Sequence, residues 1–173
     1  MQRRDTETAR VTMWAFTVLR VVVGIVFMAH GAQKLFIMGL PGVAGFFGKL
    51  GLPVPFLTGV AVTALEVLGG LVLVLGMGTR LAAGLLALDM LGAIVTVHLS
   101  QGFFLPKGME FALTLLAANL ALVLGGPGRL AVEGLCRSRQ ADSGAALTPN
   151  ARNSVQPGGD RAAHNAPEVH VSR

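Results

Sequence analysis

Eight polar or ionisable side chains that could do chemistry interrupt otherwise apolar stretches of this sequence. A charge at the centre of a lipid bilayer costs about 2.5–3.5 kcal/mol on insertion scales, so such residues usually face a protein interior and find partners. We therefore predict that they form a polar intramembrane site. The candidates are Arg20, His30, Lys34, Glu66, Asp89, His98, Glu110 and Asn119.

His30 and Lys34 are four residues apart on an expected helix, so they share one face, with Gln33 beside them. Glu66 and Glu110 are the acidic residues that could pair with this donor-rich patch. One interpretation is a set of ion pairs that only fix helix register, Arg20 with Asp89 and Lys34 with a glutamate. The other is a polar pocket that binds a quinone headgroup, a proton or a small substrate, because histidine changes charge near neutral pH.

A metal site is the third chemistry to consider. Imidazole and carboxylate ligands from His30, His98, Glu66 and Glu110 would suit zinc or iron. The sequence has no HxxH or ExxH spacing among these residues. We therefore predict no metal site.

The positions of these residues along the expected helices indicate their depth. Counting 1.5 Å per residue from the predicted interfaces places Glu66 near the midplane of the bilayer. Asp89 and His98 are nine residues apart, about 180° around an α-helix, and Glu110 and Asn119 have the same relation. The sequence therefore predicts that these groups do not all share one channel. The polar residues form two layers, with Arg20, Asp89 and Asn119 in the cytoplasmic half, and His30, Gln33, Lys34, His98 and Glu110 in the outer half.

Four apolar stretches must position these side chains. They cover about residues 14–38, 56–78, 81–99 and 106–125, and each approaches or meets the roughly 20 residues that cross about 30 Å of hydrocarbon. The hydrophobic content of 53% is too high for a soluble domain of this size. The link at Met77–Arg80 permits only a tight hairpin, so the second and third spans are neighbours. We predict an all-α fold, an integral membrane four-helix bundle.

Outside the spans, we predict a polar cytoplasmic head at 1–13, a membrane domain at 14–136 and a disordered cytoplasmic tail at 137–173, which lacks apolar periodicity. Between the first two spans, Val43, Phe46, Phe47 and Leu50 have helical spacing and predict a short interfacial helix. An irregular loop is the alternative, because glycines at 42, 45 and 48 weaken helix formation.

The net charge of +5 follows from topology better than from nucleic-acid binding, because the basic residues occupy termini and short links. The single cysteine, Cys136, excludes a disulfide or CxxC pair within one chain. Lysine and arginine asymmetry predicts a multi-pass protein of the plasma membrane with both termini cytoplasmic. Arg3, Arg4, Arg10, Arg80, Arg129, Arg137 and Arg139 lie on one side, and Lys49 and Lys107 lie on the other.

Several segments carry a family resemblance: HGAQK at 30–34, ALEVLGGLVLVLGMGTRLAAGLLALDM at 64–90 and KGMEFALTLLAANLALVLGGPGRL at 107–130. With these segments the chain resembles the DoxX family from about Leu19 to Leu130. The resemblance implies a four-helix membrane bundle. Some family members resemble the membrane subunit of thiosulfate:quinone oxidoreductase, and others are linked to membrane redox complexes that counter oxidative stress.

The resemblance and the buried polar set together predict a membrane subunit of a redox or oxidative-stress complex that is associated with quinone. The alternatives are a small proton-coupled transporter and a non-catalytic scaffold or assembly factor. The sequence has no nucleotide-binding glycine loop, nucleophile elbow or haem motif, so any enzymatic role is that of a subunit. No motif requires a cofactor, and quinone is the one that the pattern suggests. The expected partners are the lipid bilayer, other proteins or further copies of the chain, and soluble redox enzymes, with no nucleic acid.

Overall fold

The structure, a computed structural model, describes residues 2–132, and within that range it contains helices and no strand. Several helices carry a wider π-helical or tighter 3₁₀ segment at one end. The elements are α1 (Gln2–Ala32), the π-helix η1 (Gln33–Met38), α2 (Gly39–Lys49), α3 (Pro55–Leu75), α4 (Thr79–Ala93), the π-helix η2 (Ile94–His98), the 3₁₀ turn η3 (Leu99–Gln101) and α5 (Glu110–Gly125). The prediction of an all-α membrane protein is confirmed.

Three helical stretches are long and apolar enough to cross a membrane: Thr6–Lys49, Pro55–Leu75 and Thr79–Gln101. The first is continuous through α1, η1 and α2. The fourth apolar helix, α5, has 16 residues and falls short of the roughly 20 that a span needs. It begins at Glu110 rather than at Pro106, because residues 102–109 form a turn-rich loop.

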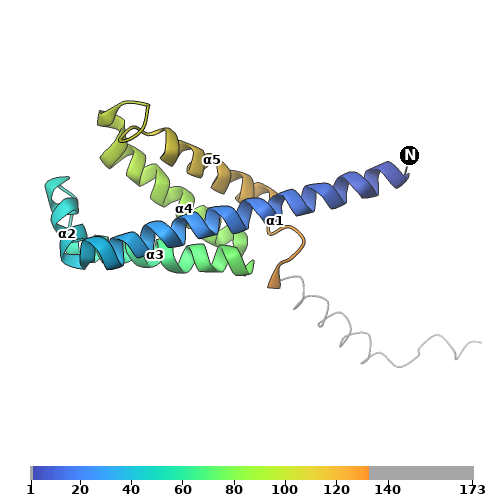
Figure 1. Ribbon diagram of the computed structural model, residues 1–173, viewed down its shortest axis with the longest axis horizontal. Coiled ribbons are helices and arrows are strands. Elements are labelled where there is room, and N and C mark those ends of the chain that lie inside the picture. Colours follow the sequence, from blue (N-terminus) through green and yellow to red (C-terminus); the bar gives the residue numbers. More distant parts are fainter. Residues whose placement is uncertain (1, 133–173) are drawn as a thin grey trace, which may run out of the picture. The chain divides into compact units, whose positions relative to one another are not determined.

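The helices pack in two pairs, α1 along α3 and α4 along α5, and the pairs are joined by the α3–α4 hairpin (Figure 1). The second and third spans are neighbours, as the short link predicted. The hairpin turns earlier than expected, because α3 ends at Leu75 and Gly76 takes a positive φ of 70°. Buried apolar side chains from all four helices, including Phe27, Leu73, Leu86 and Leu122, make the shared core.

Paired glycines bring α1 and α3 into close contact. A Cβ atom added at Gly24 would lie 2.6 Å from the carbonyl oxygen of Gly70, and one added at Gly70 would lie 2.6 Å from that of Gly24. Small residues at such crossings let two backbones approach, which drives association of helices in lipid. This crossing fixes the register between α1 and α3.

Alanine at Gly24 or Gly70 is therefore expected to destabilise the protein by about 1–3 kcal/mol, because the backbone oxygen opposite cannot move aside as a flexible side chain can. The measurement is unfolding in mixed micelles. The matched control is Gly92→Ala, since a Cβ added at Gly92 meets nothing within 4 Å. Equal stability of the Gly24 and Gly92 variants would contradict this account of the crossing.

The predicted helix between the first two spans is present as α2, and the irregular alternative is not formed. Val43 and Phe47 of α2 are buried, and α2 packs on α3. At Gly59 of α3 an added Cβ would lie 3.1 Å from Val43. Packing on α3 thus outweighs the weak helix propensity of the glycines, as it does for most helices in proteins.

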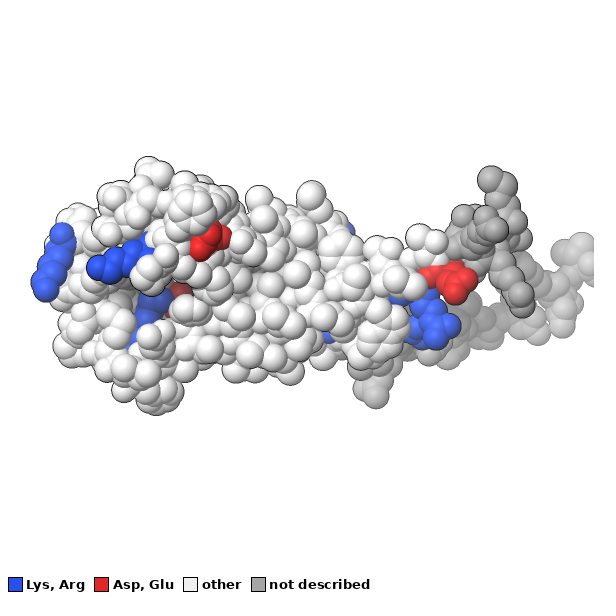
Figure 2. Space-filling model, turned by 45° about the horizontal axis from the view of Figure 1, so that its top comes forward, with Lys and Arg blue, Asp and Glu red and all other residues white. Residues whose placement is uncertain are grey.

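The polar head predicted at 1–13 is helical from Gln2, where α1 begins. No proline or glycine interrupts residues 2–13, so the apolar helix extends into this polar segment. Figure 2 shows charged side chains toward the two ends of the described part, with a long uncharged surface between them. The tail predicted at 137–173 lies outside the described residues.

Candidate functional site

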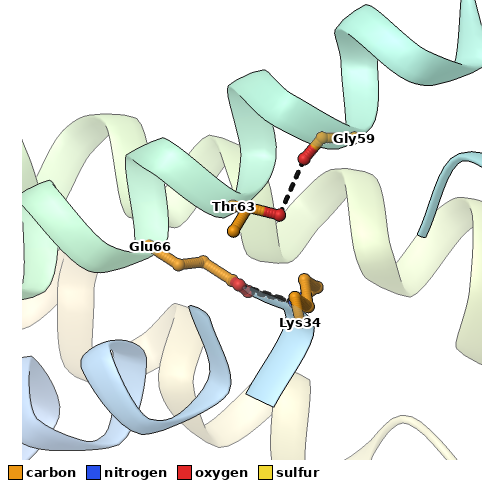
Figure 3. A network of polar contacts seen from close by, with 4 residues as sticks. All are labelled: Lys34, Gly59, Thr63 and Glu66. Atoms are coloured by element: carbon orange, nitrogen blue, oxygen red, sulfur yellow. Dashed lines mark hydrogen bonds and ion pairs between the residues drawn. The ribbon is translucent and has the colours of Figure 1, made fainter. Parts of the chain in front are cut away.

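An ion pair between Lys34 and Glu66 stands at the centre of the polar residues (Figure 3). The Lys34 Nζ atom lies 2.7 Å from Glu66 Oε1 and 2.6 Å from Oε2. The Glu66 side chain is 3% exposed and that of Lys34 is 22% exposed. The prediction that Lys34 pairs with a glutamate agrees with this geometry, and the partner is the midplane residue rather than Glu110.

The glycine crossing explains why these two side chains meet. Gly31 lies one helical turn before Lys34, and a Cβ added there would lie 2.6 Å from the side chain of Val67, next to Glu66. The close approach of this helix to α3 thus brings the Lys34 side chain into contact with Glu66. One turn before Glu66, Thr63 donates to the Gly59 carbonyl oxygen at 2.8 Å, so its hydroxyl is held by its own helix (Figure 3).

The ion pair opens onto a cavity of about 520 Å³ between η1, α2, α3, α4 and η2, which we call the main cavity. Its wall is mostly apolar. The ionisable residues on it are Lys34, Glu66, Asp89 and His98, the threonines are Thr58 and Thr96, and the other lining residues are Phe46, Phe47, Leu52, Val62, Leu65, Leu85, Leu88, Met90, Gly92, Ala93 and Val97.

Asp89 and His98 line the same cavity, although α-helical geometry placed them on opposite faces. That expectation was wrong because residues 94–98 form the π-helix η2. A π-helix bonds i to i+5 and takes more residues per turn than an α-helix, so the side chains after it are rotated back. A second π-helix, η1, carries Lys34. Both irregular segments therefore contribute residues to the wall of the main cavity.

Asp89 and His98 differ in how their polar atoms are satisfied. The Oδ2 atom of Asp89 is buried and has no hydrogen-bond partner among the described residues. The Nδ1 atom of His98 lies 2.8 Å from the carbonyl oxygen of Lys107. A carbonyl can only accept, so Nδ1 donates, and the neutral ring keeps Nε2 as an acceptor. The main cavity thus offers carboxylate and imidazole acceptors beside the Lys34 ammonium.

His30 lies in a second cavity, of about 110 Å³, which we call the histidine chamber. Its ring packs on that of Phe111 with the two centroids 5.5 Å apart. Gln33, expected beside His30, is exposed on the outside of the helix. The residues that line the chamber are Phe27, His30, Lys34, Glu66, Met90, Ala93, His98, Phe111, Ala112 and Leu115.

Arg20 lies away from both cavities and has a structural task. Its side chain is 1% exposed, and its guanidinium donates to carbonyl oxygens at the end of α3 and in the segment after α5. The acceptors are Leu73 at 2.7 Å, Val74 and Pro127 at 2.9 Å each, and Leu130. Arg20 does not form the ion pair with Asp89 that the sequence suggested, because Asp89 faces the main cavity.

Glu110 and Asn119 also lie outside the two cavities. Glu110 accepts a hydrogen bond from the Leu105 amide at 2.7 Å and so holds the loop before α5. Asn119 is fully buried, and its Nδ2 donates to the Leu115 carbonyl at 2.8 Å within its own helix. Neither side chain contributes to the candidate site.

Sequence reasoning missed Thr58, Thr96 and the aromatic wall from α2. Thr58 donates to the carbonyl of Pro53 in the segment before α3, Thr96 donates to the carbonyl of Gly92 in α4, and both residues line the cavity. A threonine in an apolar helix is ordinary, so no signal set these two apart. Among the described residues, no group of three or more potential ligands is placed to hold a metal ion.

Comparison with known proteins shows which family and which proteins this chain is similar to. The DoxX family model matches residues 15–99. The Bacillus subtilis protein named "Putative oxidoreductase CatD" is 39% identical over 60% of this chain and 75% of its own length. "Uncharacterized membrane protein Rv3486" of Mycobacterium tuberculosis is 33% identical over 73% of this chain and 84% of its own length. "Inner membrane protein YphA" of Escherichia coli is 28% identical over 67% of this chain and 86% of its own length.

No solved structure matches the chain. The family match covers α1 from residue 15 onward, the ion pair and both π-helices, and the relatives are matched over most of their length. The chain belongs to the DoxX family of membrane proteins.

Proposed function

We propose that this protein is the membrane subunit of a redox or oxidative-stress assembly and that its main cavity binds a quinone headgroup. The observation that carries the proposal is the Lys34–Glu66 ion pair, with Asp89 and His98, on the wall of an otherwise apolar cavity of about 520 Å³. Small-molecule sites are typically apolar clefts of about 300–1,000 Å³ with a few convergent polar groups. A ring with two polar ends fits this pattern.

The polar groups match both redox forms of such a ring. The Lys34 ammonium has three donors, and Glu66 engages it with two oxygens, so one donor remains for a quinone carbonyl. The free Oδ2 of Asp89 and the imidazole of His98 can accept from a quinol hydroxyl. One set of residues therefore serves the oxidised and the reduced ligand.

The apolar wall suits a lipid-soluble tail. Phe46 of α2 is 38% exposed, and Leu85 and Leu88 of α4 are 43% and 65% exposed, so the cavity wall continues onto the outer apolar surface. A ligand with an alkyl or isoprenoid tail would then leave its tail among lipid chains and its ring beside the ion pair.

Electrons would come from a partner enzyme. The sequence has one cysteine and no motif for a flavin, haem or iron–sulfur group, so this subunit would supply binding and proton chemistry. The Bacillus subtilis relative is named as an oxidoreductase, and this name supports a redox assembly. We place the assembly in the plasma membrane with the Arg80 and Arg129 end facing the cytoplasm, following the positive-inside tendency.

The test is binding of decylubiquinone to the protein in lipid nanodiscs by equilibrium titration. Hydrogen bonds that involve a charged group contribute about 1.5–3 kcal/mol, so Asp89→Asn should raise the Kd of the reduced form, decylubiquinol, by about 10–100-fold. Glu66→Gln, which removes the carboxylate that holds Lys34 in place, should raise the Kd of decylubiquinone. The matched control is Glu7→Gln, because Glu7 is an exposed carboxylate on α1 far along the chain from the cavity residues. A wild-type protein that binds no quinone, or cavity variants that bind like wild type, would overturn the proposal.

A proton-coupled carrier is the second candidate, favoured by the unpartnered carboxylate oxygen of Asp89 beside a charged pair. Flux of a solute across proteoliposomes that depends on a pH gradient and is lost in Asp89→Asn would favour it over the quinone site. A scaffold with no ligand would show neither quinone binding nor solute flux.

A further inference from the structure

The histidine chamber and the main cavity share a wall made of the ion pair and one histidine. Lys34, Glu66 and His98 line both spaces, together with Met90 and Ala93. A group in this wall can exchange a proton with either side. The chamber therefore adjoins the candidate quinone site without being part of it.

The chamber has the size and polarity to hold water. One water molecule needs a cavity of about 10–15 Å³ and two to four polar partners. The chamber has about 110 Å³, and His30, Lys34, Glu66 and His98 all line it. The His30 ring makes no hydrogen bond to another described residue, so its nitrogens are available to chamber water.

His98 connects the chamber to the end of the helix. Its Nδ1 proton is committed to the Lys107 carbonyl, which leaves Nε2 to bind and release a proton. The residues that follow, Ser100 and Gln101, are exposed. His98 thus stands between an exposed loop and the buried Glu66.

We propose that the histidine chamber is a proton-transfer site that delivers protons from the loop end to Glu66 and the main cavity. A hydronium ion at the exposed loop gives a proton to Nε2 of His98 and leaves a neutral water molecule. That N–H bond then breaks, and the proton passes through chamber water, with His30 as a second acceptor, to an oxygen of Glu66. Lys34 keeps its charge throughout, and the proton on Glu66 moves on only when a ligand in the main cavity takes it up.

Besides His98, His30 and Glu66, the charged groups that face this route are Lys34 from η1 and Asp89 from α4; α5 contributes only apolar chamber residues. The inference rests on the proposed function only in its last step. Reduction of a bound quinone by a partner redox enzyme consumes two protons with the two electrons, and the chamber would supply protons to the quinone oxygens.

The test follows carboxyl protonation after a pH step by time-resolved infrared spectroscopy of the protein in nanodiscs, with no ligand added. Spectra of Glu66→Gln and Asp89→Asn assign the carboxyl bands. The test variant combines His30→Phe, which keeps a ring against Phe111, with His98→Asn, whose amide can still donate to the Lys107 carbonyl. Because proton relays by positioned side chains contribute about 10²–10⁴-fold, protonation of Glu66 should slow by about 100-fold.

The control is Thr96→Val, which alters the main cavity and leaves the chamber intact. It should protonate at the wild-type rate. A circular dichroism spectrum and a cooperative unfolding transition in mixed micelles that match those of wild type show that the histidine double variant is folded. An unchanged protonation rate in that folded variant would overturn the chamber, whereas loss of quinone binding by the wild-type protein would overturn only the quinone site.

Discussion

Replacement of Arg20 by glutamine is expected to destabilise the protein by about 4 kcal/mol or more. The guanidinium joins three segments that are distant in sequence: α1, the end of α3 and the residues after α5. The final carbonyls of a helix have no partner within that helix, so Arg20 serves as the cap of α3. Each hydrogen bond from its charged donor is worth about 1.5–3 kcal/mol.

Lysine at position 20 should rescue less than half of the loss, because one ammonium cannot reach carbonyls on both sides as the planar fork of arginine does. The measurement is equilibrium unfolding in mixed micelles. The matched control is Arg80→Gln, since Arg80 is exposed and its one hydrogen bond within residues 2–132 is a 3.5 Å contact with the Leu124 carbonyl. If Arg20→Gln and Arg80→Gln unfold alike, Arg20 does not hold these segments together.

Replacing Lys34 and replacing Glu66, the two members of the ion pair, should destabilise the protein by unequal amounts. Lys34→Met leaves the carboxylate of Glu66, 3% exposed, without its cation and should cost about 3–5 kcal/mol. Glu66→Gln should cost about 1–2 kcal/mol, because Lys34 is 22% exposed and its long chain can carry the charge outward. The double variant Lys34→Met/Glu66→Gln should recover most of the stability lost in Lys34→Met.

A double-mutant cycle on unfolding free energies isolates this coupling. The same cycle run with Lys49, which is exposed at the end of α2, in place of Lys34 is the control and should show additive losses. A Lys34→Met/Glu66→Gln variant no more stable than Lys34→Met would mean that packing, and not the charge pair, holds this crossing.

Much of the fold could be predicted from the sequence, because a helix that crosses a lipid bilayer needs a long apolar run. Long apolar runs separated by Pro53, Pro55 and the glycines at 76 and 78 set the helices and their hairpin. The pairing of Lys34 with a glutamate was also predictable, since a buried cation needs an acid and few acids are present. The ends of the helices were harder, because the polar head continues α1 and the loop before α5 replaces its expected first turn.

The partners of the remaining polar residues were less predictable for a physical reason. Arg20 binds backbone carbonyls, which every residue has, so nothing in the sequence identifies its acceptors. Asp89 and His98 were placed on opposite faces because residue counting assumes a constant α-helical turn. Neither Ile94 nor His98 has a side chain that would mark a change of helix type.

The wider turn at residues 94–98 changes how related sequences should be aligned. A π-helix holds one more residue than the α-helical turn it replaces. In a homologue that lacks one residue there, the helix on both sides would superpose while a different side chain occupied the place of His98. A single-residue gap at this point would therefore mark a change in the wall of the main cavity rather than a harmless difference in loop length.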